Sequence, residues 1–191
     1  HYHDEPLSHP NSVPLYVLSE LARKHVKVVL TGEGADELFA GYPRYHLARM
    51  RASLEMLPSG VRASGAAIMR SLPGHRAGKA AFVLPLSLDE SILLNSAYVE
   101  PDLVAALTGS EVASSLDTRR GLVAETLDAA DPVGSISRYE LLTYLPCALD
   151  RMDRMSMAHG LEGRVPFLDV PLVEFGLRMP SSLKLGLRAN K

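Results

Sequence analysis

The sequence predicts an α/β fold, of which these 191 residues form a predominantly α-helical part with about one core strand at 26–30. The strand is indicated by the β-branched run that ends at Leu30, which is typical of a strand buried on both faces in a parallel sheet. A glycine-rich turn and a helix follow it, and apolar residues recur at helical spacing through most of the remaining chain. Because one strand cannot form a sheet, we expect its partner strands to precede His1.

Before the strand we expect a loop and one helix. Residues 1–10 hold two prolines and three histidines, whose spacing matches no compact ligand set, so a loop is favoured over a metal site. Ser12 is a residue type that caps helices, and Pro14 suits a first helical turn. Together they predict a helix at about 12–24.

After the strand, the chain predicts a series of helices. One begins at about Ala35 and continues as an apolar stripe until Pro58 ends it. The stretch 73–87 contains two prolines and two glycines and predicts a connection. Later, a helix to about His159 is followed by a turn and an extended segment at 164–169. Further helices are expected at about 59–72, 88–98, 101–108, 114–129, 135–147 and 170–178.

The composition argues against several classes of protein. The formal net charge is −2 without a basic stripe, which disfavours nucleic-acid binding, and Arg44, Arg49 and Arg51 predict a solvated helix face or at most local anion contacts. No run of about 18 apolar residues indicates a membrane span. The single cysteine, Cys147, fits a reducing compartment, and we interpret it as a small buried apolar residue. Because the chain starts at His1 rather than Met, we expect both ends to be cuts through a longer sequence.

The turn after the strand has the features of an anion site. Gly32 and Gly34 let the backbone bend sharply and let a ligand approach closely, at the strand end where open α/β sheets usually bind ligands. Three carboxylates, Glu33, Asp36 and Glu37, would repel a phosphate unless a cation intervenes. Mg²⁺ held by Asp36 and phosphate oxygens would resolve the conflict, because Mg²⁺ typically combines one or two carboxylates with phosphates. The alternative is that Asp36 and Glu37 only complement the helix dipole.

A second group of charges lies at 150–154. Asp150 and Arg154 are four residues apart and predict an ion pair on one helix face. A solvated ion-pair network is one interpretation, but three interleaved methionines indicate partial burial and predict core packing or, alternatively, an apolar wall for an adenine ring. These methionines are Met152, Met155 and Met157. Arg164 and Asp169, at the two ends of the extended segment, are expected to contact each other and brace it.

Three segments resemble the glutamine-dependent asparagine synthetase family. Two of them resemble its signature segments: LTGEGADELFAGYPRY at 30–45 and MDRMSMAHGLEGRVPFLD at 152–169. The third is the run into the first signature, DEPLSHPNSVPLYVLSELARKHVKVVL at 4–30. The two signatures in this order are highly specific. The resemblance implies an α/β domain of the adenine-nucleotide pyrophosphatase type, with residues 1–191 as part of its synthetase domain.

The resemblance also implies an enzyme, an ATP-dependent carbon–nitrogen ligase that uses ATP and Mg²⁺. Such an enzyme activates aspartate as β-aspartyl-AMP, and ammonia derived from glutamine then attacks to give asparagine, AMP and pyrophosphate. A glutaminase domain of the same protein supplies the ammonia. We further expect a cytoplasmic location and, from the charge and the lack of a long apolar run, no nucleic-acid or membrane partner. The oligomeric state is left open, with a homodimer as one alternative.

The resemblance implies roles for those residues of the turn that match the family's first signature segment. Thr31 and Gly32 correspond to residues that contact ATP, and Gly34 belongs to the same cofactor-binding turn. Asp36 corresponds to the residue that helps to hold Mg²⁺ and pyrophosphate. Glu33 corresponds to a catalytic residue, where a carboxylate could accept a proton from the attacking ammonia. Related β-lactam-forming synthetases carry Tyr at this position, so Glu33 favours an external ammonia nucleophile.

Two basic residues of the second signature, Arg154 and Arg164, are expected to bind the cofactor, whereas Arg151 matches a signature position without an assigned role. The family's SGGxDS pyrophosphate loop and the glutaminase cysteine are absent from this sequence, so we expect the isolated chain to be inactive. One alternative is a related amide-forming synthetase that acts on another carboxylic acid or peptide. Another is a non-catalytic helical module, which the retained Glu33 and Asp36 disfavour.

Overall fold

The computed structural model describes most of the chain as two compact units. The described residues are 9–94, 101–109 and 113–185. Unit 1 consists of His1–Phe39 and Glu140–Met179, and unit 2 of Ala40–Tyr139 and Pro180–Lys191. No helix among the described residues has both the length and the apolar character needed to cross a membrane.

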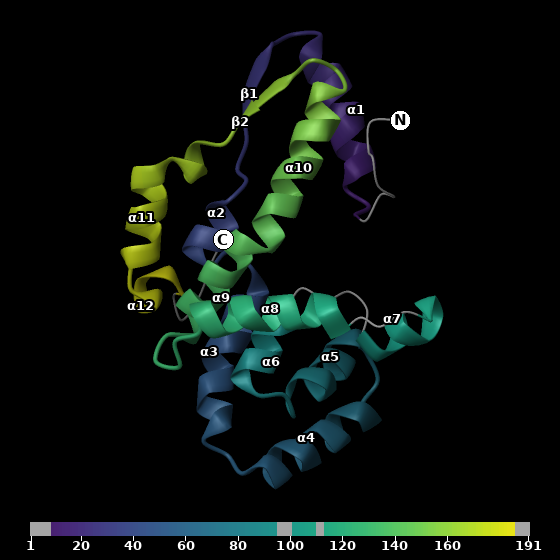
Figure 1. Cartoon of the computed structure of the whole chain (residues 1–191), viewed down its shortest axis with the longest axis vertical. Coiled ribbons are helices and arrows are strands. Elements are labelled where there is room, and N and C mark those ends of the chain that lie inside the picture. Colours follow the sequence, from purple (N-terminus) through teal and green to yellow (C-terminus); the bar gives the residue numbers. More distant parts are fainter. Residues whose placement is uncertain (1–8, 95–100, 110–112, 186–191) are drawn as a thin grey trace. The chain divides into compact units, whose positions relative to one another are not determined.

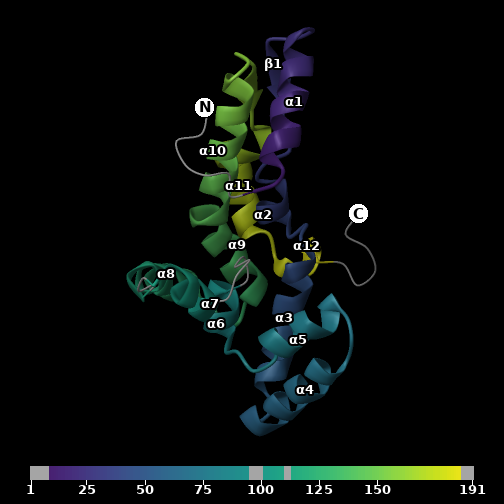
Figure 2. The same cartoon turned by 90° about the vertical axis from the view of Figure 1, so that its right-hand side faces the viewer.

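Unit 1 combines helices with a pair of short strands. Its elements are α1 (Ser12–Arg23), β1 (Val28–Leu30), α2 (Ala35–Phe39), α10 (Tyr144–Met157), β2 (Glu162–Arg164), the 3₁₀ helix η1 (Pro166–Leu168) and α11 (Val170–Arg178). Helix α1 packs along α10 in both views (Figures 1 and 2), and α2 packs against α11. The helices expected at 12–24 and 170–178 are therefore confirmed. The loop expected at 1–10 lies outside the described residues except for its last two, neither of which is helical.

The two strands pair in parallel, with Val28 opposite Glu162 and Leu30 opposite Arg164. The strand that begins the sheet thus has a partner inside this chain, and the prediction that its partners all precede His1 is wrong. The sequence of β2, Glu-Gly-Arg, contains no β-branched or alternating apolar residues. It therefore carries no strand signal of its own, and its extended shape depends on pairing and packing with distant residues.

Strand β1 is shorter and more exposed than its composition predicts. It spans three residues rather than the expected five at 26–30. Val28 is 47% exposed and Leu30 is 76% exposed, so the prediction of a strand buried on both faces is wrong for this chain. The physical reason is that two strands alone leave much of each sheet face uncovered, because a parallel strand becomes fully buried only with neighbours and covering helices.

Unit 2 is an array of helices around one apolar core. Its elements are α3 (Pro43–Glu55), α4 (Ser59–Ser71), α5 (His75–Val83), α6 (Leu88–Leu93), α7 (Pro101–Thr108), α8 (Ala113–Thr126), α9 (Pro132–Leu142, whose last residues belong to unit 1) and α12 (Ser181–Lys184). Helix α4 packs against α5, and α6 packs against α3 and α8. The core contains Ala40, Tyr45, Ala48, Leu88, Ile92, Leu93, Val123, Val133, Ile136, Tyr139 and Leu185.

Local sequence explains where several helices of unit 2 begin. Ser87 and Glu90 form a capping box before α6: Glu90 N donates to Ser87 Oγ at 3.4 Å, and Ser87 N donates to a Glu90 carboxylate oxygen at 3.0 Å. Pro43 and Pro132 are the first residues of α3 and α9, where a missing N–H costs no helical hydrogen bond. Helices expected at 59–72, 101–108 and 114–129 are found with boundaries shifted by a few residues at most.

Three expected boundaries are wrong. The continuous helix expected from Ala35 to Pro58 is interrupted between α2 and α3, where Ala40 has a φ of 57° and cannot continue a right-handed helix. The stretch 73–87 contains α5, because its two prolines and one of its glycines lie outside the alanine-rich helical segment. The helix expected at 135–147 is divided between α9 and α10 at Thr143. The last residues of the helix expected at 88–98 lie outside the described part of the chain.

Two side chains also differ from their expected exposure. Arg51, expected on a solvated helix face, is 1% exposed and donates from a terminal guanidinium nitrogen to Leu84 O at 2.8 Å. Cys147, expected to be buried, is exposed, and its sulfur contacts Thr143 O at 3.5 Å. Both errors have the same origin, since the spacing of residues along a helix does not say which face packs inward.

Candidate functional site

The turn between β1 and α2 forms the first part of the candidate site. Gly34 has a φ of 88°, a left-handed conformation that side chains rarely adopt, and a Cβ there would overlap the side chain of Leu168. A Cβ on Gly32, by contrast, would meet nothing within 4 Å. The Leu168 side chain of η1 therefore packs directly against the turn at Gly34, whereas the backbone of the turn stays accessible at Gly32.

The second signature segment lies directly beside this turn. Thr31 N donates to Arg164 O at 2.9 Å, and Thr31 Oγ1 donates to Met152 Sδ at 3.3 Å. A Cβ on Gly163 would lie 3.2 Å from Met152 Cε, so the glycine allows α10 to approach β2 closely. Figure 1 shows β1 and β2 next to each other at one end of α10. The fold thus joins Thr31 to a residue 121 positions away.

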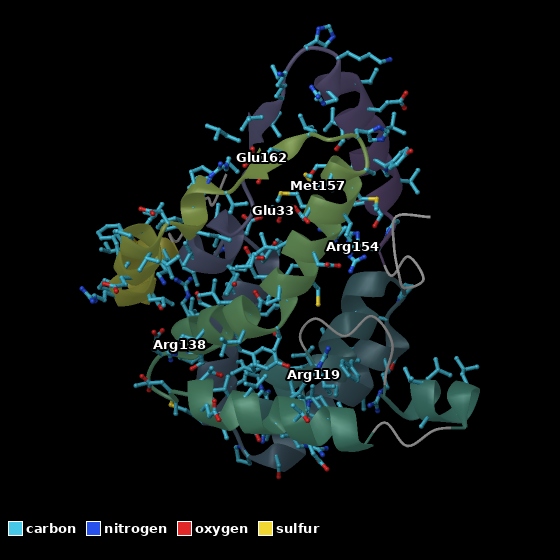
Figure 3. The ribbon with its side chains drawn as sticks, turned by 45° about the horizontal axis from the view of Figure 1, so that its top comes forward. Glu33, Arg119, Arg138, Arg154, Met157 and Glu162 are labelled. Atoms are coloured by element: carbon cyan, nitrogen blue, oxygen red, sulfur yellow. The ribbon has the colours of Figure 1, made fainter. Side chains whose placement is uncertain are left out.

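Carboxylates gather at the turn and in the first turn of α2. Glu37 is buried, with 1% exposure, and Glu33 and Asp36 are partly buried. Burial raises the pKa of Glu33, the positive charge of Arg151 opposes that rise, and the negative charges of Glu37 and Asp36 add to it. Glu33 lies on the turn in the region of α10 (Figure 3). The structure therefore brings Glu33, Asp36 and a cation of the second signature into one electrostatic group.

The two arginines predicted to bind the cofactor make ion pairs within their own elements. Arg154 Nε lies 2.8 Å from Asp150 Oδ1, which confirms the pair expected from their spacing. A terminal nitrogen of Arg164 lies 2.8 Å from Glu162 Oε1, and both side chains are exposed. The predicted contact between Arg164 and Asp169 is therefore not formed, because Arg164 extends along the strand edge to Glu162 instead. Asp169 precedes α11 as its N-cap residue, without a side-chain capping hydrogen bond.

An open groove of about 370 Å³ runs along α10. It is lined by Asp150, Asp153, Arg154, Met157 and Ala158. The other two methionines of this helix are buried, as core packing predicts, whereas Met157 is 53% exposed at the groove. Within the described part of the chain, no three His, Cys, Asp or Glu side chains form a group that could hold a metal by themselves.

Comparison with protein families agrees with these signature segments. The family model described as asparagine synthase matches residues 1–191. The chain belongs to the asparagine synthase family. The resemblance inferred from the two signature segments is confirmed by this match, and the described residues, mostly helical with a parallel strand pair, are consistent with a part of the asparagine synthase domain.

Similar proteins from several organisms cover the chain almost completely. A putative glutamine-hydrolyzing asparagine synthetase of Mycobacterium tuberculosis (strain ATCC 25618 / H37Rv) is 36% identical over 194 residues, which cover 100% of this chain and 30% of that protein. Glutamine-hydrolyzing asparagine synthetase 1 of Bacillus subtilis (strain 168) is 30% identical and covers 95% of the chain. Amidase chry2 of Gibberella zeae is 25% identical and covers 99%. The chain spans 29–31% of these relatives' lengths, and no solved structure matches it.

Sequence reasoning left one residue of this electrostatic group without a role. The positive charge of Arg151 opposes the rise in the pKa of Glu33, although only Arg154 and Arg164 were expected to bind at the site. A signal was present in the helical spacing, because Arg151 precedes the buried Met155 by four positions and therefore lies on the same face of α10. Asp150 and Arg154 share a different face, where they pair with each other.

Proposed function

We propose that this chain is part of an ATP-dependent asparagine synthetase. The complete enzyme would activate aspartate as β-aspartyl-AMP, and ammonia derived from glutamine would attack it to give asparagine, AMP and pyrophosphate. The observation that carries the proposal is the parallel pairing of Leu30 with Arg164, which sets the Glu33 turn beside the second signature segment. Family membership and relatives named glutamine-hydrolyzing asparagine synthetases support the same reaction.

The turn would bind the phosphate part of ATP through Thr31, Gly32 and Gly34. Its backbone is accessible at Gly32, where even a Cβ would meet no neighbour within 4 Å. Asp36 would hold Mg²⁺ together with phosphate oxygens, since Mg²⁺ is usually bound through one or two carboxylates and substrate phosphates. When bound, Mg²⁺ would supply the positive charge that lets a phosphate lie beside the carboxylates of this turn.

Glu33 would act as the proton acceptor. As the nitrogen of ammonia forms its bond to the acyl carbon, it must lose a proton, and a carboxylate within hydrogen-bond reach can take it. Burial raises the pKa of Glu33, which makes its carboxylate a stronger base than an exposed one. Arg154 and Arg164 would bind the anionic nucleotide. To do so, Arg154 would give up its ion pair with Asp150, and Arg164 would give up its ion pair with Glu162.

The remaining parts of the reaction would come from the rest of the protein. The chain spans 30% of the length of its mycobacterial relative, so the pyrophosphate loop and the glutaminase domain would lie in other segments. The isolated chain should therefore be inactive. A related synthetase for another carboxylic acid, or a non-catalytic module, is not favoured by any contact in the structure.

The full-length protein tests this proposal directly. With ATP, Mg²⁺, aspartate and either glutamine or ammonium, it should form equal amounts of asparagine, AMP and pyrophosphate. Glu33→Gln should lower asparagine formation by about 10²–10⁴-fold without changing the circular dichroism spectrum. Glu174→Gln, an exposed carboxylate on α11, serves as the matched control and should behave as the wild type. A folded wild-type protein that forms no asparagine, or an E33Q variant with wild-type rates, would contradict the proposal.

A further inference from the structure

Thr31, the first residue of the turn, uses both of its hydrogen-bond donors within the fold. Its backbone N–H donates to Arg164 O at 2.9 Å, and its hydroxyl donates to Met152 Sδ at 3.3 Å. The direction of the second bond is fixed by chemistry, because a thioether sulfur carries no hydrogen and can only accept. A threonine hydroxyl has one proton and two lone pairs, so Thr31 is left with acceptors alone.

The position of the Met152 sulfur is determined by the packing around it. Met152 is 6% exposed on the buried side of α10. A Cβ on Gly163 would lie 3.2 Å from Met152 Cε and 3.4 Å from Met152 Sδ, so the side chain fills the space that the glycine leaves. Thr31 itself is half-buried, and the next residue, Gly32, is exposed. The hydroxyl proton is therefore held inside the protein, at a residue that directly precedes the exposed backbone of the turn.

We propose that Met152 is a positioning residue for Thr31, holding its hydroxyl proton so that the Thr31 oxygen accepts a hydrogen bond from the nucleotide. This inference rests on the proposed function and narrows the contact that Thr31 makes in it. Ionised phosphate oxygens only accept hydrogen bonds, so they would meet the exposed backbone at Gly32 rather than the Thr31 hydroxyl. Thr31 would meet a neighbouring donor, and ATP offers two kinds, the ribose hydroxyls and the adenine amino group.

Nucleotide selectivity of the full-length protein tests which group Thr31 meets. Calorimetry with Mg²⁺ and without aspartate gives dissociation constants for ATP, 2′-deoxyATP, 3′-deoxyATP and an ATP analogue that lacks the adenine amino group. Thr31→Val should lower the preference for ATP over one of the three analogues by about three- to tenfold, because only that analogue lacks the donor. Thr31→Ser retains the hydroxyl and should restore the preference. If Thr31→Val weakens ATP and every analogue equally, Thr31 contacts the phosphates and the inference is overturned.

The role of the sulfur is tested at Met152 itself. Met152→Leu keeps an apolar side chain of similar size but removes the acceptor. The freed hydroxyl proton can then turn toward the ligand, so the same preference should fall by about two- to threefold. Met155→Leu is the matched control, because Met155 is 5% exposed on the same helix, and it should keep the wild-type preference. In a Thr31→Val background, Met152→Leu should have no further effect on the preference. Equal preferences in Met152→Leu and Met155→Leu would overturn the inference.

The contact can also be observed without nucleotide or activity. In full-length protein labelled with ¹³C at the methionine methyl groups, the Met152 signal is identified by its loss in Met152→Leu. This signal should shift in Thr31→Val, whereas the Met155 signal should not, and an unshifted Met152 signal would contradict the contact. If Met152→Leu does not fold, the selectivities of Thr31→Val and Thr31→Ser decide.

The outcomes separate this inference from the proposed function. If the selectivity and the methyl shift are as expected but the wild type makes no asparagine, the inference stands and the proposed function fails. If asparagine forms but Met152→Leu behaves as Met155→Leu does, the proposed function stands and the inference fails. A folded wild-type protein that binds no ATP would contradict both.

Discussion

The interior of each unit is packed in a different way. In unit 1, glycines allow segments to approach closely, because a Cβ at Gly34 would overlap Leu168 and a Cβ at Gly163 would lie 3.2 Å from Met152. In unit 2, large apolar side chains fill a common core around Ile92, which is completely buried. Unit 1 should therefore be sensitive to atoms that are added, and unit 2 to atoms that are removed. Unit 1 contains the turn of the candidate site, whereas unit 2 contains the apolar core.

The largest expected effect on stability is in unit 2. Ile92→Ala removes buried methyl and methylene groups and should destabilise the protein by about 2–5 kcal/mol, because the core cannot fully close around the cavity. Leu103→Ala, at a site that is 52% exposed, should change stability by no more than about 0.5 kcal/mol. Thermal unfolding of both variants of the full-length protein measures the difference. Equal effects would show that the core of unit 2 does not carry its stability.

Adding one methyl group to the turn of unit 1 should have the next largest effect. Gly34→Ala combines a strained φ of 88° with an overlap with Leu168, and should cost about 1–3 kcal/mol. Gly32→Ala adds the same methyl group where nothing lies within 4 Å, and its unfolding temperature should stay close to that of the wild type. If the two alanine variants have the same unfolding temperature, the close packing of the turn against η1 does not contribute to stability.

A smaller effect should follow pH. Burial raises the pKa of Glu33 above its ordinary value of 4.5, so this residue stabilises the fold fully below pH 4.5 and loses that contribution as pH rises through its folded-state pKa. Glu33→Gln has no charge to bury, and should be more stable than the wild type at pH 7 by no more than about 0.5 kcal/mol, since solvent screens a partly exposed charge. Unfolding temperatures from pH 4.5 to 8 should show this difference growing with pH. If the difference in unfolding temperature between Glu33→Gln and the wild type shrinks as pH rises, the negative charge of Glu33 stabilises the fold and the prediction is wrong.

The smallest effect is expected at an exposed ion pair of unit 1. Arg178 and Glu174 are one helical turn apart on α11, with a separation of 2.9 Å and largely exposed side chains. Arg178→Gln should lower stability by about 0–0.5 kcal/mol, and the loss should vanish in high salt. Thermal unfolding with and without added salt provides the measurement, and a large salt-independent loss would assign this surface pair a packing role.

The elements that could be predicted from sequence are those that carry their own signals. Residues 12–23 and 170–178 have apolar stripes and proline near the start, so their helices were located almost to the residue. Strand β2 could not be predicted, because its Glu-Gly-Arg sequence becomes extended only through pairing with β1. The interruption at Ala40 was also missed, since a left-handed alanine is imposed by tertiary contacts rather than by local preference.

The same contrast applies to the candidate site. The turn from Thr31 to Asp36 was recognisable because its glycines and carboxylates are adjacent in sequence. Which arginine would influence the charge of Glu33 was not, since Arg151 and Arg154 are equally basic and differ in the face of α10 that they occupy. That choice depends on how α10 packs, and packing is a property of residues far away along the chain.

The contact between Thr31 and Met152 spans 121 positions, which has a consequence for protein synthesis. At about 5–20 residues per second, a ribosome needs roughly 6–24 s after Thr31 to produce Met152. Throughout this interval the nascent chain carries β1, with the apolar Val28 and Leu30, before its partner β2 has been translated. Helices α3 to α9 are translated between β1 and β2, so the two strands can pair only after these helices have emerged, and until then the unpaired edge of β1 is open to pairing with other chains.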